Sequence, residues 1–106
     1  MLDTSYADAH NNLAVAFLRS GEFEQAIAHY KQAVAIDPGS AEMQYNLGNA
    51  LAREGDWAGA IACYEAALRT ERDSVKAAKV RNNLGGAFER IGKSDQAFEQ
   101  FVKAVQ

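Results

Sequence analysis

An asparagine followed seven residues later by an arginine occurs three times along this chain. The pairs are Asn12 with Arg19, Asn46 with Arg53, and Asn83 with Arg90. Residues seven apart lie on the same face of an α-helix, so each pair presents an amide and a guanidinium on one face. An amide carries both a donor and an acceptor and can pair with a peptide group, whereas a guanidinium pairs with acidic groups. The pattern indicates binding of an extended, acidic peptide.

Two structural explanations compete with this ligand-binding hypothesis. A repeated asparagine can hydrogen-bond a neighbouring helix and hold the register of a stack, because buried polar groups must be paired. Each arginine falls in the last turn before a glycine, where a cation interacts favourably with the helix dipole. The sequence leaves both explanations open beside peptide binding.

Side-chain sets that could catalyse a reaction or hold a metal ion are scarce. His10 and His29 lie 19 residues apart on different predicted helices, with no carboxylate or cysteine at metal-ligand spacing, and we expect surface or packing roles for them. Cys63 is the single cysteine, so it can form no internal disulfide. The serines that fall at predicted helix ends, where capping explains them, are Ser20, Ser40, Ser74 and Ser94. We expect a non-enzymatic chain without a metal or another cofactor.

The composition argues against other classes of partner. The net charge is −3 at pH 7 and acids and bases are interleaved, whereas a nucleic-acid surface needs clustered positive charge. No apolar stretch approaches the roughly 20 residues that cross a bilayer, and no signal-peptide core follows Met1. We therefore expect a protein or peptide partner, with no nucleic acid and no membrane. The cell compartment is left open, with the cytoplasm slightly favoured.

The elements that would position these side chains repeat along the chain. An octet that begins at Asn11 returns at Tyr45 and again at Asn82, which are 34 and 37 residues further on. Behind each octet come a glycine, an alanine, an aromatic residue and a second alanine. These series are Gly21, Ala26, Tyr30, Ala33; then Gly55, Ala60, Tyr64, Ala67; then Gly92, Ala97, Phe101, Ala104. A unit of this length cannot bury its own apolar face and must stack on copies of itself.

The residue pattern within each repeat predicts two helices. The first ends at a glycine suited to a left-handed cap, and the second carries the apolar stripe of an amphipathic helix. Pro38 and Gly39 end the second helix of the first repeat, and Asp56 is an N-cap candidate in the second repeat. Small residues on one helix let the ring of a neighbouring helix sit close. The aromatic residues expected in the core are Tyr30, Trp57, Tyr64 and Phe101.

This pattern of Leu-Gly, alanine, aromatic residue and proline resembles the tetratricopeptide repeat, from Ala7 to Val105. The resemblance implies an all-α, right-handed superhelical solenoid of about three antiparallel helix pairs. It implies one domain over residues 1–106, with repeats at 7–40, 41–74 and 78–106 and an insertion at 75–77. Residues 2–6 align with the end of a preceding repeat, so we expect a fragment of a longer array. The departures from the family pattern are His10, Gln44 and Arg81 in place of the usual tryptophan, and Arg72 in place of the closing proline.

The insertion between the second and third repeats lies around Asp73 to Ala77. We expect a turn at Arg72 and Asp73, with Asp73 or Ser74 capping a lengthened helix. A continuous helix that opens this junction and swaps between chains is the alternative.

In the resembled family the first helices line a concave groove, which would hold the repeated asparagines in a row. Asn12, Asn46 and Asn83 look like the asparagine ladder in the repeats of the O-linked N-acetylglucosamine transferases, which implies recognition of a peptide backbone. The candidate peptide-binding residues are Asn11, Asn12, Arg19, Tyr45, Asn46, Asn49, Arg53, Lys79, Asn82, Asn83 and Arg90.

The carboxylate clamp of co-chaperone repeat domains is a second binding mode of the family, made of two lysines, two asparagines and an arginine. Asn46 and Lys79 match it, but Asn11, Val15 and Asn83 occupy the other three places. Since Val15 offers no side-chain donor, we expect no binding of a chaperone tail.

The last predicted helix carries an apolar face that no further repeat covers in this sequence, and solenoid ends need polar caps to stay soluble. Val102 is apolar where its counterparts are Lys31 and Glu65. The residues of this candidate self-association face are Phe98, Phe101, Val102 and Val105. We expect a scaffold that binds a peptide and that forms homo-oligomers through this helix. The alternatives are a substrate-recruiting arm of a larger enzyme, such as a glycosyltransferase, and a module for self-assembly.

Overall fold

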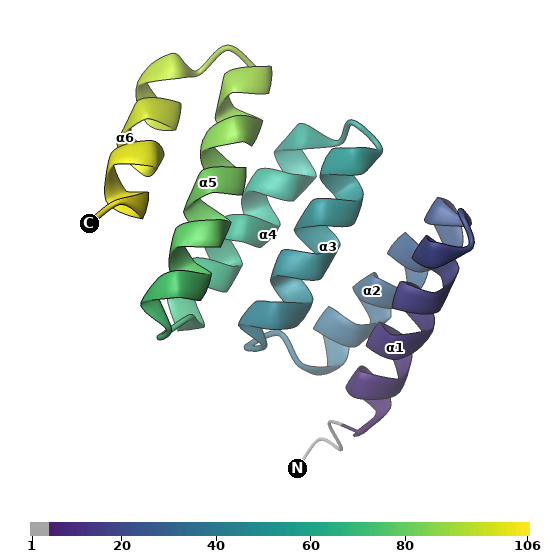
Figure 1. Ribbon diagram of the computed structural model, residues 1–106. Coiled ribbons are helices and arrows are strands. Elements are labelled where there is room, and N and C mark those ends of the chain that lie inside the picture. The colour runs from purple at the N-terminus through teal and green to yellow at the C-terminus, as the bar shows by residue number, and fades with distance from the viewer. Residues whose placement is uncertain (1–4) are drawn as a thin grey trace.

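The computed structural model describes residues 5–106, which form six α-helices and no strand (Figure 1). The helices are α1 (Ser5–Arg19), α2 (Phe23–Ile36), α3 (Ala41–Arg53), α4 (Trp57–Thr70), α5 (Ser74–Arg90) and α6 (Ser94–Ala104). Consecutive helices form three antiparallel pairs that stack in chain order, with α1, α3 and α5 on one side of the stack (Figure 1). The expected all-α solenoid is confirmed. The expected tail of a preceding repeat lies largely at residues 2–4, outside the described residues.

The first helix of every pair ends in the same way. Gly21, Gly55 and Gly92 have φ angles of 83°, 83° and 79°, in the left-handed region that an L side chain rarely adopts. The next residue then donates its backbone N–H back to a carbonyl five residues earlier. These bonds are Glu22 to Phe17, Asp56 to Leu51 and Lys93 to Phe88, each 2.9 Å. The pattern is a Schellman cap, and it confirms the predicted role of the three glycines.

Side-chain caps begin three of the helices. Asp56 accepts a hydrogen bond from the Gly59 N–H at 2.9 Å, which confirms the predicted N-cap of α4, and Ser40 caps α3. Capping by Ser74 and Ser94 was a wrong expectation, because these residues are the first of α5 and α6. Asp73 caps α5 instead, whereas the N-cap of α6 is Lys93, which makes no side-chain capping bond.

The insertion is absorbed into α5, which has 17 residues where α3 has 13. Asp73 accepts hydrogen bonds from the N–H groups of Val75 and Lys76 at 2.9 and 3.1 Å. The preceding helix ends at Thr70, so the chain turns between α4 and α5, as the residue types predicted. The continuous helix of the alternative is not formed in this structure.

The core consists of alanines and aromatic rings from neighbouring helices. Tyr64 is only 2% exposed and its ring lies against Gly48, where an added Cβ would meet ring carbon Cε1 at 2.7 Å. Phe101 lies against Gly85 in the same way, with a Cβ-to-Cε1 distance of 2.6 Å. This confirms the predicted pairing of small and large residues. Trp57 and Phe101 are half-buried, and both pack against the core as expected, Trp57 against its main cluster and Phe101 against buried Gly85.

Candidate peptide-binding groove

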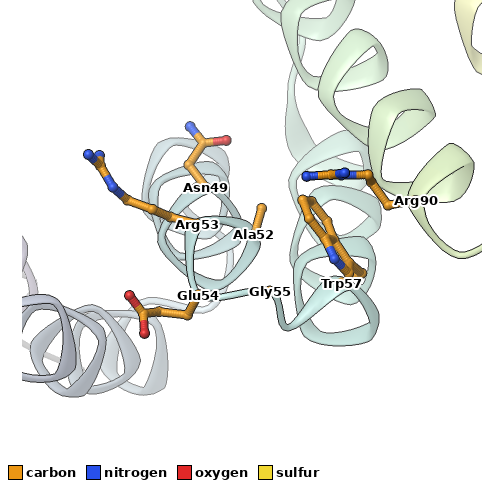
Figure 2. A pocket seen from close by; sticks show the side chains of 7 residues that line it. All are labelled: Asn49, Ala52, Arg53, Glu54, Gly55, Trp57 and Arg90. Carbon is orange, nitrogen blue, oxygen red and sulfur yellow. The ribbon is translucent and has the colours of Figure 1, made fainter.

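The groove between α3 and α5 contains many of the predicted site residues. A hollow of about 490 Å³ lies between these helices. A second, more open hollow of about 690 Å³ adjoins it and is lined by residues of α3, α5 and the start of α4. Asn49 and Arg90 line both, and Trp57 reaches them from α4. A third hollow, which includes Tyr45, Asn46 and Lys79, lies nearer the N-terminal ends of α3 and α5. The side chains of the open hollow appear in Figure 2.

The asparagines link consecutive repeats to each other. Asn46 Nδ2 donates to Asn11 Oδ1 at 3.3 Å, and Asn83 Nδ2 donates to the Tyr45 hydroxyl at 3.0 Å. Asn11 and Tyr45 hold equivalent positions, so one inter-repeat bond occurs twice. Asn83 also donates to Asn49 Oδ1 at 2.9 Å. These bonds match the explanation in which asparagines hold the register of the stack, while peptide binding by the same amides stays a prediction.

The remaining hydrogen-bonding capacity of these amides is what a ligand could use. The carbonyl oxygens of Asn46 and Asn83 accept no hydrogen bond from the described residues. Asn46 lines the third hollow and Asn83 lines the hollow beside Trp57. By contrast, Asn11 is 8% exposed, so its side chain is closed to a ligand. That burial counts against a direct role for Asn11 in peptide binding.

A buried tyrosine fixes the orientation of Asn49. The Tyr64 hydroxyl donates to Asn49 Oδ1 at 2.6 Å. Burial raises the pKa of Tyr64 to about 12, with neighbouring Tyr45 adding to the rise and the nearby Asn83 amide opposing it. Tyr64 is therefore a neutral donor at physiological pH. Since Oδ1 of Asn49 accepts from two donors, its Nδ2 group is the part left for another partner.

Two arginines lie over aromatic rings instead of pairing with acids. The guanidinium carbon of Arg53 is 4.7 Å from the centroid of Phe23, and that of Arg90 is 4.9 Å from the centroid of Trp57. Each arginine thus reaches the first residue of the second helix in the preceding pair (Figure 2 shows Arg90 over Trp57). The residue types did not predict these contacts. A guanidinium over a ring is held by cation–π attraction.

Other predicted residues are more scattered. Asn12 and Arg19 are exposed and line none of the three hollows, and no side-chain hydrogen bond joins Asn12 to its equivalents Asn46 and Asn83. Asn82 is also exposed, but it lines the hollow between α3 and α5. The residues of the expected self-association face lie on α6, where Phe98, Val102 and Val105 are exposed and Phe101 is half-buried against Gly85.

The two histidines meet, although the sequence did not predict it. Their Nδ1 atoms are 3.0 Å apart, so His10 on α1 and His29 on α2 share one hydrogen bond. Phe17 stacks on His29, with ring centroids 5.5 Å apart. This is a packing role. Within residues 5–106, no three histidine, cysteine or acidic side chains gather as a metal site.

The single cysteine, Cys63, lies half-buried on α4. Burial raises the pKa of the Cys63 thiol, which favours the unreactive protonated form. None of the described helices is long and apolar enough to cross a bilayer.

Comparison with known proteins identifies the repeats. The families described as "TPR repeat" and "Tetratricopeptide repeat" match residues 16–55 and 39–106. No curated protein matches the chain. Among solved structures, the N-terminal domain of stress-induced protein-1 (STI-1) from C. elegans is 25% identical with a TM-score of 0.89, over 96% of this chain and 84% of that one.

Two further structures show the same fold. MamA is 28% identical with a TM-score of 0.87, and the match covers 97% of this chain but 58% of MamA. The second TPR of Spaghetti (RPAP3), bound to the HSP90 peptide SRMEEVD, is 22% identical with a TM-score of 0.87, over 96% of this chain and 92% of that one. Because the family described as "Tetratricopeptide repeat" matches residues 39–106, which is more than half of the chain and includes its last two helix pairs, the chain belongs to the tetratricopeptide repeat family.

Proposed function

We propose that this protein is a non-enzymatic scaffold that binds an extended peptide segment in the groove between α3 and α5. The observation that carries the proposal is the pair of asparagines at equivalent positions, Asn46 and Asn83, each anchored through Nδ2 and each lining a hollow of the groove. Anchoring reduces the entropy lost on binding, and the carbonyl oxygens remain to accept peptide N–H groups.

Backbone recognition of this kind depends little on the side chains of the ligand. The Spaghetti structure holds an HSP90 peptide, which supports peptide binding as a use of this fold. Val15 stands at a clamp position here, so we do not extend that ligand to this chain. Affinity should be modest, about micromolar, because an extended ligand loses conformational entropy on binding.

An alanine substitution at Asn46 tests the proposal. Asn46→Ala removes an amide of the groove and the inter-repeat bond, whereas Asn11→Ala removes only the buried acceptor of that bond. Binding is measured by fluorescence anisotropy with labelled peptides selected on an array of unstructured sequences. We expect Asn46→Ala to weaken binding about tenfold, from the usual worth of one hydrogen bond, and Asn11→Ala, which removes only the anchor of the Asn46 amide, to weaken it less. An unchanged affinity for folded Asn46→Ala would contradict the proposal.

A second candidate function is assembly of copies end to end. Leu13 on α1 is 43% exposed, whereas its equivalents Leu47 and Leu84 are 4% and 1% exposed. Phe98 on α6 is 70% exposed, at the position where Ile61 of α4 packs against the core. The two open faces thus correspond to the two sides of an interface that the chain already forms twice, between α2 and α3 and between α4 and α5.

Light scattering after size exclusion, over a hundredfold range of concentration, tests this assembly. We expect the mass to rise with concentration and Phe98→Glu to hold the protein as a monomer. A constant monomeric mass at the highest concentration would exclude assembly. A role as the recruiting arm of a larger enzyme would add to the scaffold function, and the sequence of the full-length parent tests it.

A further inference from the structure

Arg90 is a cation without a partner in an acidic chain. The chain has 14 acidic residues against 11 basic ones, yet within residues 5–106 the one ion pair joins Lys103 to Glu99 at 3.0 Å. Arg90 is the last residue of α5, and its helical neighbours at the spacings that form ion pairs are Gly86 and Ala87, neither of them acidic. The aromatic ring of Trp57 is therefore the contact that holds the guanidinium in place.

Stacking leaves the binding edge of a guanidinium free. The guanidinium of Arg90 lies over the ring of Trp57, with its central carbon 4.9 Å from the ring centroid, and its N–H donors lie in its own plane, at its edges (Figure 2). A carboxylate or a phosphate binds such an edge through two parallel hydrogen bonds. An arginine whose guanidinium is already held over an aromatic ring loses less side-chain entropy when it binds a ligand than a mobile arginine does.

The rest of the hollow is suited to an acceptor. Asn49 lines it and has Nδ2 donors left over, because its oxygen already accepts from Tyr64 and Asn83. Glu54 and Glu89 are the acids of the adjoining hollows, and neither lies within ion-pair distance of Arg90. In Figure 2 the Glu54 carboxylate points away from the Trp57–Arg90 stack.

The related stack of Arg53 on Phe23 has different surroundings. The hollow at Phe23 is lined by three carboxylates, those of Glu22, Glu24 and Glu54. These acids would repel an anionic ligand on the Phe23 side, so Arg53 is a weaker anion-binding candidate than Arg90, although both line the open hollow.

We propose that the Trp57–Arg90 stack is an oxyanion subsite of the groove, which binds a carboxylate or phosphate on a side chain of the bound peptide. The subsite rests on the proposed peptide-binding function. It makes the scaffold selective for segments that carry an acidic or phosphorylated residue where the peptide passes Arg90. The groove amides would hydrogen-bond the backbone of the bound peptide, and Arg90 would bind the negatively charged group on its side chain.

The test uses Trp57 as its own reporter, since it is the only tryptophan of the chain. Trp57 fluorescence is titrated with three capped peptides, based on the best sequence from the array, that differ only in a central glutamate, phosphoserine or glutamine. We expect the glutamate or phosphoserine peptide to bind at least about tenfold more tightly than the glutamine peptide, from the strength of charge-assisted hydrogen bonds. The preference should shrink at high salt. Comparison of the first two peptides distinguishes a carboxylate from a phosphate ligand.

Three variants complete the test. Arg90→Gln should equalise the three affinities, and Arg90→Lys should lose most of the preference, because an ammonium group cannot bind an oxyanion with a planar fork. Arg69→Gln, at an exposed arginine of α4 that lines none of the three hollows of the groove, should keep the preference. Circular dichroism confirms that each variant is folded. Equal affinity of the wild type for the three peptides would overturn the subsite and leave the groove proposal intact, whereas a preference that survives in Arg90→Gln would place the subsite elsewhere. Failure of every peptide to bind would overturn both proposals.

Discussion

Replacing Gly48 by alanine should destabilise this protein, although alanine is the better helix former. The added Cβ would lie 2.7 Å from Cε1 of Tyr64 and 3.2 Å from Cβ of Cys63. Tyr64 is buried and its hydroxyl bonds Asn49 at 2.6 Å, so the ring cannot move aside without losing that bond. In a close-packed protein interior the neighbouring atoms have little room to shift and accommodate an added methyl group.

The magnitude follows from two opposing effects. Alanine in place of a helical glycine stabilises by about 0.8–1.0 kcal/mol. Overpacking a well-packed core costs about 1–3 kcal/mol, and displacing the Tyr64 hydroxyl from its acceptor costs about 1–3 kcal/mol more. The net loss for Gly48→Ala should therefore be about 1–5 kcal/mol, by combining these three ranges.

Gly86→Ala is the matched control. Gly86 also lies inside a first helix, but an added Cβ there would meet nothing within 4 Å. This variant should gain up to about 1 kcal/mol from helix propensity alone. Gly85→Ala should fall between the two, because the ring it meets belongs to half-buried Phe101, which can shift more easily.

Urea unfolding followed by circular dichroism at 222 nm measures all three variants, with the free energy of unfolding extrapolated to water. The slopes against urea concentration should stay equal, since the helices that unfold are the same. A Gly48→Ala protein as stable as the wild type, beside a stabilised Gly86→Ala protein, would refute the close contact of Tyr64 with α3.

Three further perturbations test the caps and the buried tyrosine. The pKa of Tyr64 is about 12 in the fold against 10 when unfolded, so its stabilising contribution is complete below pH 10 and is lost as the pH rises to 12, by up to about 3 kcal/mol. The free energy of unfolding, measured from pH 8 to 12, should fall over this range in the wild type and should fall less in Tyr64→Phe. The same dependence on pH in both proteins would be inconsistent with the raised pKa of Tyr64. Asp73→Ala removes the cap of α5 and should cost about 1 kcal/mol, measured as a lower Tm, while Asp73→Asn should cost less. Gly55→Ala places a side chain at a φ of 83° and should lower the free energy of unfolding in urea by about 1 kcal/mol or more. Gly39 has no positive φ, so Gly39→Ala should not lower this free energy. An equal decrease for Gly39→Ala would argue against backbone strain as the cause.

Local features of the chain predicted the elements of this fold because their causes are local. A helix ends at Gly55 because glycine reaches the left-handed region at no steric cost, and α4 begins after Asp56 because its carboxylate accepts a nearby N–H. Asp73 marked the junction at the insertion for the same reason. Three copies in phase predicted the stacking of helix pairs, since no single pair can bury its apolar face.

The contacts between repeats needed the tertiary structure. The sequence places Asn11 and Asn12 side by side, but consecutive helical residues point about 100° apart, and the rotation of α1 against α3 decides which one is buried. Asn11 bonds Asn46, while Asn12 remains exposed. The offset between stacked pairs likewise brings Arg90 over Trp57.

Periodicity therefore determined by itself which helices exist, where they end and which stripe of each is apolar, because these depend on neighbours along the chain. Only the tertiary structure decided which polar side chains meet, because that depends on the angle and offset at which one helix lies on the next. The candidate site is built from such meetings: Asn83 with Tyr45, 38 residues away, and Arg90 with Trp57.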